Sequence, residues 1–217
     1  MEQPANKWGD MIEKTVNFGR EDKSSKCAKI DPKDSKYDEF RHCSHVLIYA
    51  KTNSEFETFQ KKAIILMQMR CDGYIGFPGG FVDAGETPVQ ALCRELREEL
   101  NWCDGTKTIT EAHHQFSHVD MKNRMVFHFY AVEISEEEMA HIESNMTKAL
   151  DYGNEVLGNF RVPLYIMGDA FRGFPAFLKN HFIGNAKLQL IEALINLELI
   201  TEEQVVQALH SAPLITI

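Results

Sequence analysis

The chain has 217 residues, of which 44% are hydrophobic and 25% are charged, as expected for a globular protein with one sizeable core. These proportions exclude a disordered, collagen-like or low-complexity chain. Asp and Glu outnumber Lys and Arg by 32 to 23, and the net charge of −9 argues against a broad electrostatic grip on nucleic acid. A local basic patch, or a pocket for one end of an RNA, is compatible with this charge.

The sequence predicts a cytosolic or nuclear protein with reduced thiols. No segment approaches the roughly 18 apolar residues of a membrane span, and the start of the chain lacks the basic-then-apolar pattern of a signal peptide. The cysteine count is odd and no pair has the Cys-x-x-Cys spacing, which argues against a disulfide framework and a structural zinc site. The five cysteines are Cys27, Cys43, Cys71, Cys93 and Cys103.

Residues 1–40 differ from the rest and are predicted to be an N-terminal extension, partly helical and polar. Four apolar residues between Trp8 and Val16 have the spacing of one short amphipathic helix. Residues 19–39 are polar, and their lysines are nearly balanced by acids, which favours a solvated tail over an RNA contact. Residues 41–217 are predicted to form a single domain.

Apolar runs bounded by turn residues predict strands in this domain, and apolar residues at helical spacing predict helices. The elements in chain order are strands at 45–50 and 63–70, a Gly-rich loop at 76–81, a helix at 87–100, a strand at 125–132, a helix capped by Ser135, a strand at 155–164, and helices at 186–199 and 201–210. Strands interleaved with helices predict a mixed α/β domain.

The predicted helix at 87–100 is the most informative stretch, because it carries three glutamates on one face. Glu95, Glu98 and Glu99 lie three and four residues apart, so their side chains project together. Such carboxylates repel one another in a cleft unless a cation is present, and oxygen ligands suit Mg²⁺ or Mn²⁺. Taken alone, the three glutamates are more typical of a solvated helix face. Their surroundings therefore decide the interpretation.

The surrounding residues complete a longer pattern. Gly80 is followed after five residues by Glu86, and after seven more by Arg94-Glu95-Leu96-x-Glu98-Glu99. This pattern resembles the Nudix box, the signature of the Nudix hydrolases. The resemblance implies an α/β/α sandwich with a mixed sheet, in which the box forms a loop, a helix and a second loop. It also implies metal-dependent hydrolysis of a nucleoside diphosphate linked to another group.

The resemblance implies a role for each charged residue of the box. Glu95, Glu98 and Glu99 match the metal-binding carboxylates, and Glu98 and Glu99 are also expected to act in catalysis. Arg94 and Glu86 match a pair that braces the loop against the helix, and we group them with the catalytic residues.

One position departs from the family pattern. Asn101 stands where the family has Gly, at the end of the helix, and Asn is the next-best residue for a left-handed helix cap. Trp102 replaces a usual aliphatic residue. We therefore expect the fold and the metal site to be preserved.

Outside the box, the sequence resembles the nuclear snoRNA-decapping Nudix enzymes, also known as inosine diphosphatases. The likeness covers residues 41–200 and includes Ala63-Ile64-Ile65-Leu66-Met67-Gln68-Met69-Arg70, Gly76-Phe77-Pro78-Gly79-Gly80-Phe81-Val82-Asp83 and Phe182-Ile183-Gly184. It implies activity on (deoxy)inosine diphosphate-type substrates and on 5′ caps of RNA. It also implies a homodimer and a nuclear location, in nucleoplasm or nucleolus, with a cytoplasmic pool as an alternative.

The resemblance extends to residues outside the box. His45, Arg70, Phe77 and Gln189 match substrate-binding residues. Further metal ligands are implied for the Gly79 carbonyl, His118 and Glu155, and Glu155 is also implied in catalysis.

Each of these residues also has a purely structural interpretation. His45 fits a hydrogen-bonded strand histidine, Phe77 fits the hydrophobic core, Arg70 fits a surface turn and Glu155 fits an ordinary surface acid. The neighbouring His113 and His114 are predicted to be exposed strand residues.

The sequence thus predicts a hydrolase in which Mg²⁺ or Mn²⁺ holds a diphosphate and activates water, with Glu155, Glu98 or His118 accepting the proton. Two alternatives remain open. One is a Nudix pyrophosphatase for ADP-ribose, dinucleotides or coenzyme A. The other is a non-catalytic RNA-binding adaptor, since relatives of the decapping enzymes have lost catalytic acids; this chain keeps Glu95, Glu98 and Glu99.

Overall fold

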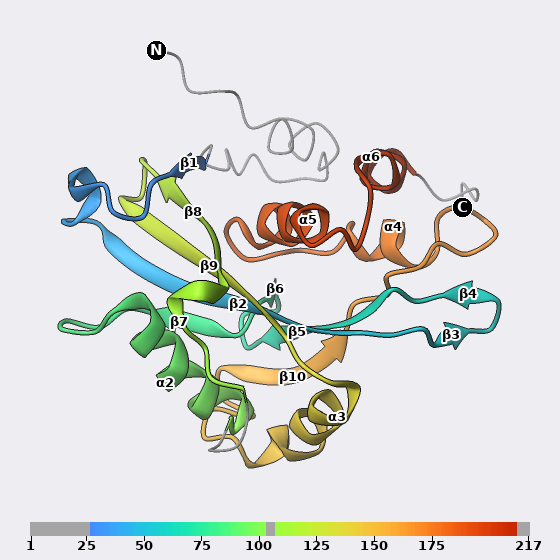
Figure 1. Ribbon diagram of the computed structural model, residues 1–217, viewed down its shortest axis with the longest axis horizontal. Coiled ribbons are helices and arrows are strands. Elements are labelled where there is room, and N and C mark those ends of the chain that lie inside the picture. The colour runs from blue at the N-terminus through green and yellow to red at the C-terminus, as the bar shows by residue number, and fades with distance from the viewer. Residues whose placement is uncertain (1–26, 103–106, 212–217) are drawn as a thin grey trace.

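The computed structural model describes residues 27–102 and 107–211, which fold around one mixed β-sheet (Figure 1). The strand order is β1-β8-β9-β2-β5-β10, with β7 paired to β2 and β6 paired to β5. The β2–β9 pair is parallel and the other pairs are antiparallel. The strands are β1 (Ala28–Ile30), β2 (Arg41–Lys51), β5 (Ala63–Arg70), β6 (Ile75–Gly76), β7 (Gly79–Phe81), β8 (His114–Asp120), β9 (Met125–Glu133) and β10 (Val156–Arg161), with a separate hairpin of β3 (Glu55–Phe56) and β4 (Phe59–Gln60).

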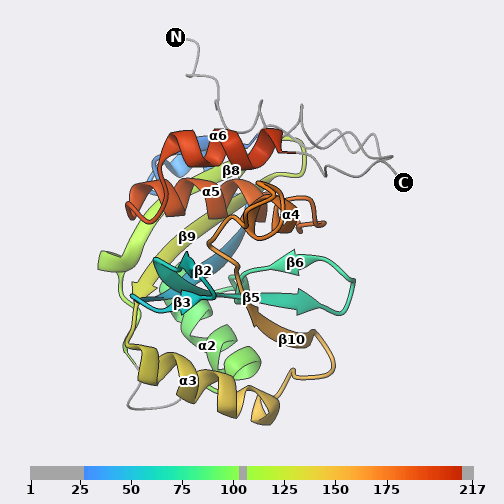
Figure 2. The same ribbon diagram turned by 90° about the vertical axis from the view of Figure 1, so that its right-hand side faces the viewer.

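Helices cover both faces of this sheet, as Figures 1 and 2 show. The α-helices are α2 (Pro88–Leu100), α3 (Glu136–Asn145), α4 (Phe174–Phe177), α5 (Ala186–Asn196) and α6 (Glu202–His210), and the 3-10 turns are η1 (Ser35–Tyr37), η2 (Glu111–His113) and η3 (Met146–Lys148). No helix of the described ranges is both long and apolar enough to cross a membrane.

Two hydrophobic cores lie between the sheet and the helices that cover it, one core on each face. Alternate residues of β2 point to opposite faces, so Val46 and Ile48 join the core beneath α2 and α3, whereas Leu47 and Tyr49 join the core beneath α4, α5 and α6. Leu96 is fully buried in the first of these cores. The structure therefore confirms the α/β/α sandwich with a mixed sheet.

The Gly-rich segment opens the sheet between β2 and β5. The two strands pair directly only where residues 48–51 meet residues 63–66. Beyond that point β7 pairs with β2 through residues 43–45, and β6 pairs with β5 at Gln68 and Met69. The segment from β6 to β7 therefore lies in an opening in the middle of the sheet, directly before α2.

Local sequence accounts for both ends of α2. The Thr87 hydroxyl accepts from Gln90 N, and the Gln90 side chain accepts from Thr87 N, which completes a capping box before Pro88. At the other end Asn101 adopts the left-handed conformation, with φ of 53°, and its N–H donates to the carbonyls of Arg97 and Leu96. The predicted left-handed cap at Asn101 is confirmed.

The structure differs from the predicted elements in several places. The sheet begins at Ala28, because β1 pairs with β8, so the ordered fold starts before the expected boundary at residue 41. The polar connection after β2 contains the β3–β4 hairpin, and α4 was not predicted from its four residues. His113 belongs to η2 and His114 is half-buried in β8, so the prediction of two exposed strand histidines is wrong. The expected helix near Trp8 lies outside the described residues.

A chain of hydrogen bonds through three histidines ties β2, β8 and β9 together. The Nε2 atom of His114 lies 2.9 Å from Ser117 Oγ, which lies 2.9 Å from His128 Nδ1. On the other side, His128 Nε2 lies 2.8 Å from His42 Nδ1, and His42 Nε2 lies 3.1 Å from the Tyr37 carbonyl. Because that carbonyl can only accept, neutral His42 donates from Nε2 and accepts from His128 at Nδ1. Every hydrogen bond of this network can therefore form while all three imidazoles are neutral.

The histidine network predicts that the contribution of His128 to stability falls in acid. Burial, followed by the neighbouring His42 and His114, lowers the pKa of His128 from 6.5 to about 4. The unfolded chain therefore binds a proton between pH 6.5 and 4 that the folded chain does not, and stability is lost across that window by on the order of 2–3 kcal/mol from this residue. The measurement is urea unfolding at pH 7 and pH 4.5.

The stability of His128→Gln relative to the wild type is expected to be higher at pH 4.5 than at pH 7. His141→Gln, which changes an exposed histidine of α3, serves as the matched control and keeps the wild-type difference. An unchanged pH dependence in His128→Gln would contradict this account of the histidine chain.

Candidate active site

The buried carboxylate of Glu99 lies in the opening of the sheet. Only 4% of Glu99 is exposed, and one carboxylate oxygen accepts from the Gly79 N–H at 2.8 Å. Burial raises the pKa of Glu99 to about 8; the N–H of Gly79 opposes this shift, and the Glu95 charge adds to it. Glu99 is thus a carboxylate that needs positive charge nearby in order to stay ionised at neutral pH.

Arg94 joins the glutamates of α2 to the loop before it. Its Nε and Nη2 atoms donate to the two carboxylate oxygens of Glu86 at 3.0 and 3.1 Å. Its Nη1 atom donates to Glu95 at 2.9 Å and to Glu98 at 3.1 Å, and Nη2 also donates to the Phe81 carbonyl at 3.0 Å. The structure therefore places Arg94 and Glu86 as the brace that the family resemblance implies.

Arg94→Lys is expected to lower activity by about 10–100-fold, because a lysine cannot bridge three carboxylates with a planar fork. Steady-state hydrolysis rates check the change. Arg97→Lys, on the exposed side of the same helix, is the matched control and should retain wild-type rates. Equal rates for the two variants would show that Arg94 does not hold the glutamates in place.

Glu95 faces two further carboxylates. Burial raises the pKa of Glu95, and the charges of Glu98 and Glu155 raise it further, whereas Arg94 lowers it. Glu155 is exposed and precedes β10, where its backbone carbonyl accepts from Cys71 N at 2.9 Å. The β10 edge thus brings Glu155 toward α2 from a distant part of the sequence.

These residues fit a hard divalent cation by their chemistry. All the donors are oxygens, and the mutual repulsion of Glu95, Glu98 and Glu155 is relieved by a cation. A Cβ at Gly80 would lie 2.6 Å from the carboxylate carbon of Glu95, so any other residue here would require this carboxylate to move. Within residues 27–102 and 107–211, no three His, Cys, Asp or Glu side chains already converge around one point.

The opposite side of the opening carries two predicted substrate-binding residues. Burial and the charge of Arg70 lower the pKa of His45 to about 4, and its buried Nδ1 atom has no hydrogen-bond partner among the described residues. Arg70 donates from Nε and Nη2 to one oxygen of Asp72 at 3.2 and 3.1 Å, and its charge also lowers the pKa of Glu99. Arg70 therefore lies near both the carboxylates and His45.

Phe77 and Gln189 are buried on the side of the sheet covered by α5. Phe77 is 4% exposed and meets Phe129 edge to face at 4.9 Å, so in this structure it is a core side chain. Stacking of a base on Phe77 would require the ring to become accessible. Gln189 is also buried, and its Nε2 atom has no hydrogen-bond partner within residues 27–102 and 107–211.

His118 is not placed beside the α2 glutamates. It is fully buried in β8, with Nε2 3.1 Å from a Glu192 carboxylate oxygen and Nδ1 3.4 Å from the Asn185 amide, and both partners belong to the α5 segment. The structure thus brings Glu86, Arg94, Glu95, Glu98, Glu99, Gly79 and Glu155 together and leaves His118 on the other face.

Gln68 was not predicted as a site residue. This residue of β5 is 1% exposed, and its side chain helps to keep the pKa of Glu99 from rising further. The signal was present, since a glutamine in an otherwise apolar buried strand needs a polar partner. Strand alternation alone does not reveal which residue that partner is.

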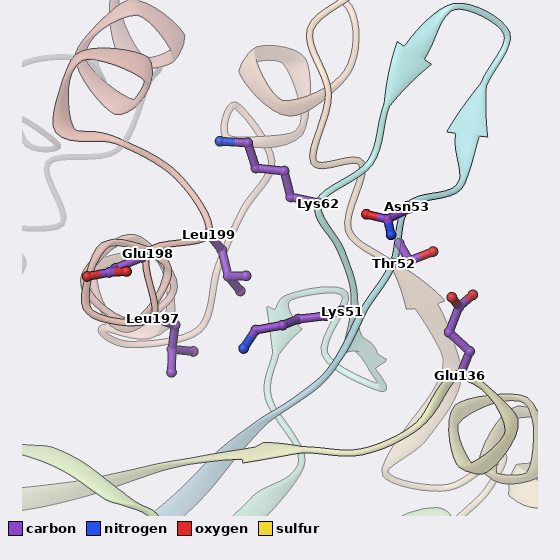
Figure 3. Close-up of a pocket in the computed structure, with 8 residues that line it drawn as sticks. All are labelled: Lys51, Thr52, Asn53, Lys62, Glu136, Leu197, Glu198 and Leu199. Atoms are coloured by element: carbon purple, nitrogen blue, oxygen red, sulfur yellow. The ribbon is translucent and has the colours of Figure 1, made fainter.

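A hollow of about 440 Å³ lies elsewhere on the molecule (Figure 3). It contains none of the predicted site residues, and Lys51, one of its two lysines, is paired with Glu133 at 3.0 Å. Lys51 ends β2 six residues after His45, about 20 Å along the strand. Its lining residues are Lys51, Thr52, Asn53, Lys62, Glu136, Leu197, Glu198 and Leu199.

Known proteins resemble this chain over most of its length. The model of the Nudt16-like family, described as U8 snoRNA-decapping enzyme-like, matches residues 42–200. A U8 snoRNA-decapping enzyme from Homalodisca vitripennis is 42% identical over 175 residues, covering 79% of this chain and 93% of that protein. A Tudor-interacting repair regulator protein from Homo sapiens is 39% identical over 173 residues, covering 79% and 81% of the two chains.

The crystal structure of a MutT/nudix family protein from Enterococcus faecalis covers 79% of this chain and 68% of that chain, at 16% identity and a TM-score of 0.48. The family match spans every described residue of the predicted site, from His45 to Gln189. The chain therefore belongs to the Nudt16-like family of Nudix hydrolases.

Proposed function

We propose that this protein hydrolyses phosphoanhydride bonds in (deoxy)inosine diphosphate-type nucleotides and in the 5′ caps of RNA, with Mg²⁺ or Mn²⁺ as its cofactor. The observation that carries the proposal is the buried Glu99 carboxylate, held by the Gly79 N–H beside Glu95 and the Arg94 brace. The decapping activity named for the Homalodisca relative supports the RNA substrate.

The cofactor would be held by Glu95, Glu98, Glu99, Glu155 and the Gly79 carbonyl. When bound, it neutralises the diphosphate charge and makes water a better nucleophile.

The other steps belong to side chains of the chain itself. Arg70 is placed to pair with a phosphate, because it lies near both Glu99 and His45. Glu155 is exposed next to Glu95 and is therefore the better placed proton acceptor, with Glu98 as the alternative. His118 is fully buried against α5 and is less accessible to water than either. Catalysis then consists largely of positioning and charge neutralisation.

The test is a substrate panel assayed with Mg²⁺, with Mn²⁺ and with EDTA. The panel holds inosine and deoxyinosine diphosphates, capped RNA, ADP-ribose, a dinucleotide and coenzyme A. We expect metal-dependent turnover with the highest kcat/KM for the inosine nucleotides and capped RNA. Preferential hydrolysis of ADP-ribose, a dinucleotide or coenzyme A would replace the proposed substrates with those of another Nudix pyrophosphatase.

A non-catalytic adaptor is the remaining alternative. RNA binding without turnover of any member of the panel would favour it, in line with the regulatory name of the human relative. The presence of Glu95, Glu98 and Glu99 in one arrangement favours the enzyme.

Self-association and location complete the proposal. We propose a homodimer and a nuclear location, both on the basis of the family resemblance. Light scattering of the purified chain and imaging of a tagged protein test them, and a monomer or a protein excluded from the nucleus would refute the respective part.

A further inference from the structure

Two arginines stack on two aromatic rings at the end of the sheet where β2 begins. The Arg41 guanidinium lies 3.3 Å from the ring centre of Phe81, and the Arg124 guanidinium lies 4.7 Å from that of Phe40. The Arg41 N–H donates to the Arg124 carbonyl at 3.0 Å, which fixes the two pairs side by side. We call these four residues the arginine–aromatic ledge.

The ledge is open to solvent and carries uncompensated positive charge. Both arginines are exposed, and 38% of Phe81 is exposed. Among the residues that the structure describes, neither guanidinium forms an ion pair or a side-chain hydrogen bond. The nearby acid Asp83 lies 3.7 Å from Arg94 rather than on the ledge.

Two exposed acids precede the ledge in sequence, Asp38 and Glu39, and they reduce its positive potential. They do not pair with Arg41 or Arg124. Cys43 pairs with Phe81 across β2 and β7; burial raises its pKa, the Arg41 charge lowers it in part and the Glu95 charge raises it.

The ledge is continuous with the candidate active site. Phe81 follows Gly79 and Gly80 in β7, and its carbonyl accepts from Arg94, whose other nitrogen holds Glu95. The ring of Phe81 thus belongs to the ledge, while its backbone carbonyl accepts a hydrogen bond from Arg94. In Figure 1 the start of β2 and the turn between β8 and β9 lie together at the left end of the sheet.

We propose that the arginine–aromatic ledge binds the first nucleotides of a single-stranded RNA whose 5′ end lies in the candidate active site. A guanidinium pairs with a phosphate in a fork geometry, and an aromatic face stacks on a base whatever its sequence. Alternating arginines and rings therefore match the alternation of phosphates and bases along a strand. This proposal rests on the proposed function, since it extends the substrate beyond the cap.

The chemistry of the ledge favours RNA over an acidic peptide. Both ligands would satisfy Arg41 and Arg124, but only the RNA also offers bases that can stack on the partly exposed Phe81 ring. Binding by one short ledge is compatible with the acidic chain as a whole, because it needs only a few phosphates and not a long basic surface.

The experiment compares a capped RNA of ten nucleotides with inosine diphosphate, using the full chain. The RNA is labelled at its 3′ end, and its binding is followed by fluorescence anisotropy in EDTA; KM for both substrates is measured with Mn²⁺. The double variant Arg41→Ala/Arg124→Ala is expected to bind the RNA about tenfold more weakly, and its salt dependence should fall by about 1.4 in log–log slope, at about 0.7 per phosphate contact. KM for inosine diphosphate should not change.

Two further variants separate the rings from the charge. Phe81→Leu should weaken RNA binding. Phe81→Tyr should bind RNA as tightly as the wild type, because a tyrosine ring can also stack on a base. Arg172→Ala removes an exposed arginine next to Asp169, far from the ledge in sequence, and serves as the control for the loss of a surface arginine, with wild-type RNA binding expected.

The outcomes distinguish the ledge from the proposed function. RNA binding and a salt slope that are unchanged in the double variant would overturn the ledge, whether or not the enzyme turns over. Equal losses for Arg172→Ala and the double variant would likewise overturn it, since the effect would then be general charge. Loss of turnover on every substrate, with ledge-dependent RNA binding intact, would refute the hydrolase and leave the ledge standing.

Discussion

Glu99→Gln is expected to lower kcat by about 10³-fold, because a lost anionic ligand removes several kcal/mol of charge stabilisation from the transition state. The fold should persist, since an amide oxygen can still accept from the Gly79 N–H. The measurement is the hydrolysis rate together with urea unfolding. Glu137→Gln, an exposed acid of α3, is the matched control and should keep the wild-type rate.

The same variant carries a second signature, which is independent of turnover. The folded pKa of Glu99 is raised to about 8 from 4.5, so the folded chain binds more protons than the unfolded chain between these values. In EDTA the contribution of Glu99 to stability should therefore fall as pH rises from 4.5 to 8, so the stability of Glu99→Gln relative to the wild type should rise over the same range. Full activity in Glu99→Gln, or an unchanged pH dependence of its stability, would contradict the role assigned to this buried carboxylate.

Gly79→Ala should produce the largest loss of stability, of about 4 kcal/mol, with loss of activity. Gly79 has φ of +125°, and a Cβ there would overlap the Ser44 carbonyl oxygen and lie 2.8 Å from the Cα of His45. The substitution forces β7 away from β2 and displaces the N–H that holds Glu99. Urea unfolding and hydrolysis rates measure the two effects.

Gly85→Ala is the matched control for this change. Gly85 also has a positive φ, +89°, but nothing lies within 4 Å of a Cβ at that position. Gly85→Ala should therefore lose only the stability that a left-handed backbone costs an alanine, about 1–2 kcal/mol, and should retain most of its activity. Equal losses in the two variants would show that the close approach of β7 to β2 is not what requires Gly79.

The sequence predicts α2 and its glutamates well because the information there is local. The cap at Thr87, the apolar spacing through Leu96 and the left-handed Asn101 all depend on residues within a few positions of one another. The same holds for the carboxylates, since helical geometry alone places Glu95 and Glu98 beside Arg94.

The positions of the site residues outside the Nudix box depend on the order of the strands in the sheet, which a single sequence does not reveal. Glu155 reaches Glu95 because β10 pairs with β5, and His118 faces Glu192 because β8 lies under α5. Phe77 was predicted from resemblance as a substrate-binding residue, but its neighbour Phe129 comes from a strand 52 positions away. Such contacts are set by packing between layers, and no local pattern encodes them.

The most direct test of the account is the release of 5′-monophosphorylated RNA from a capped RNA while Mn²⁺ is titrated into the metal-free wild-type protein. We expect no product in EDTA and a rate that rises with Mn²⁺ to saturation, and we expect Glu99→Gln to stay about 10³-fold slower than the wild type at every Mn²⁺ concentration. Product formation in EDTA, or none at saturating Mn²⁺ and Mg²⁺ with a folded protein, would contradict the claim that the α2 carboxylates form a metal-dependent hydrolytic site.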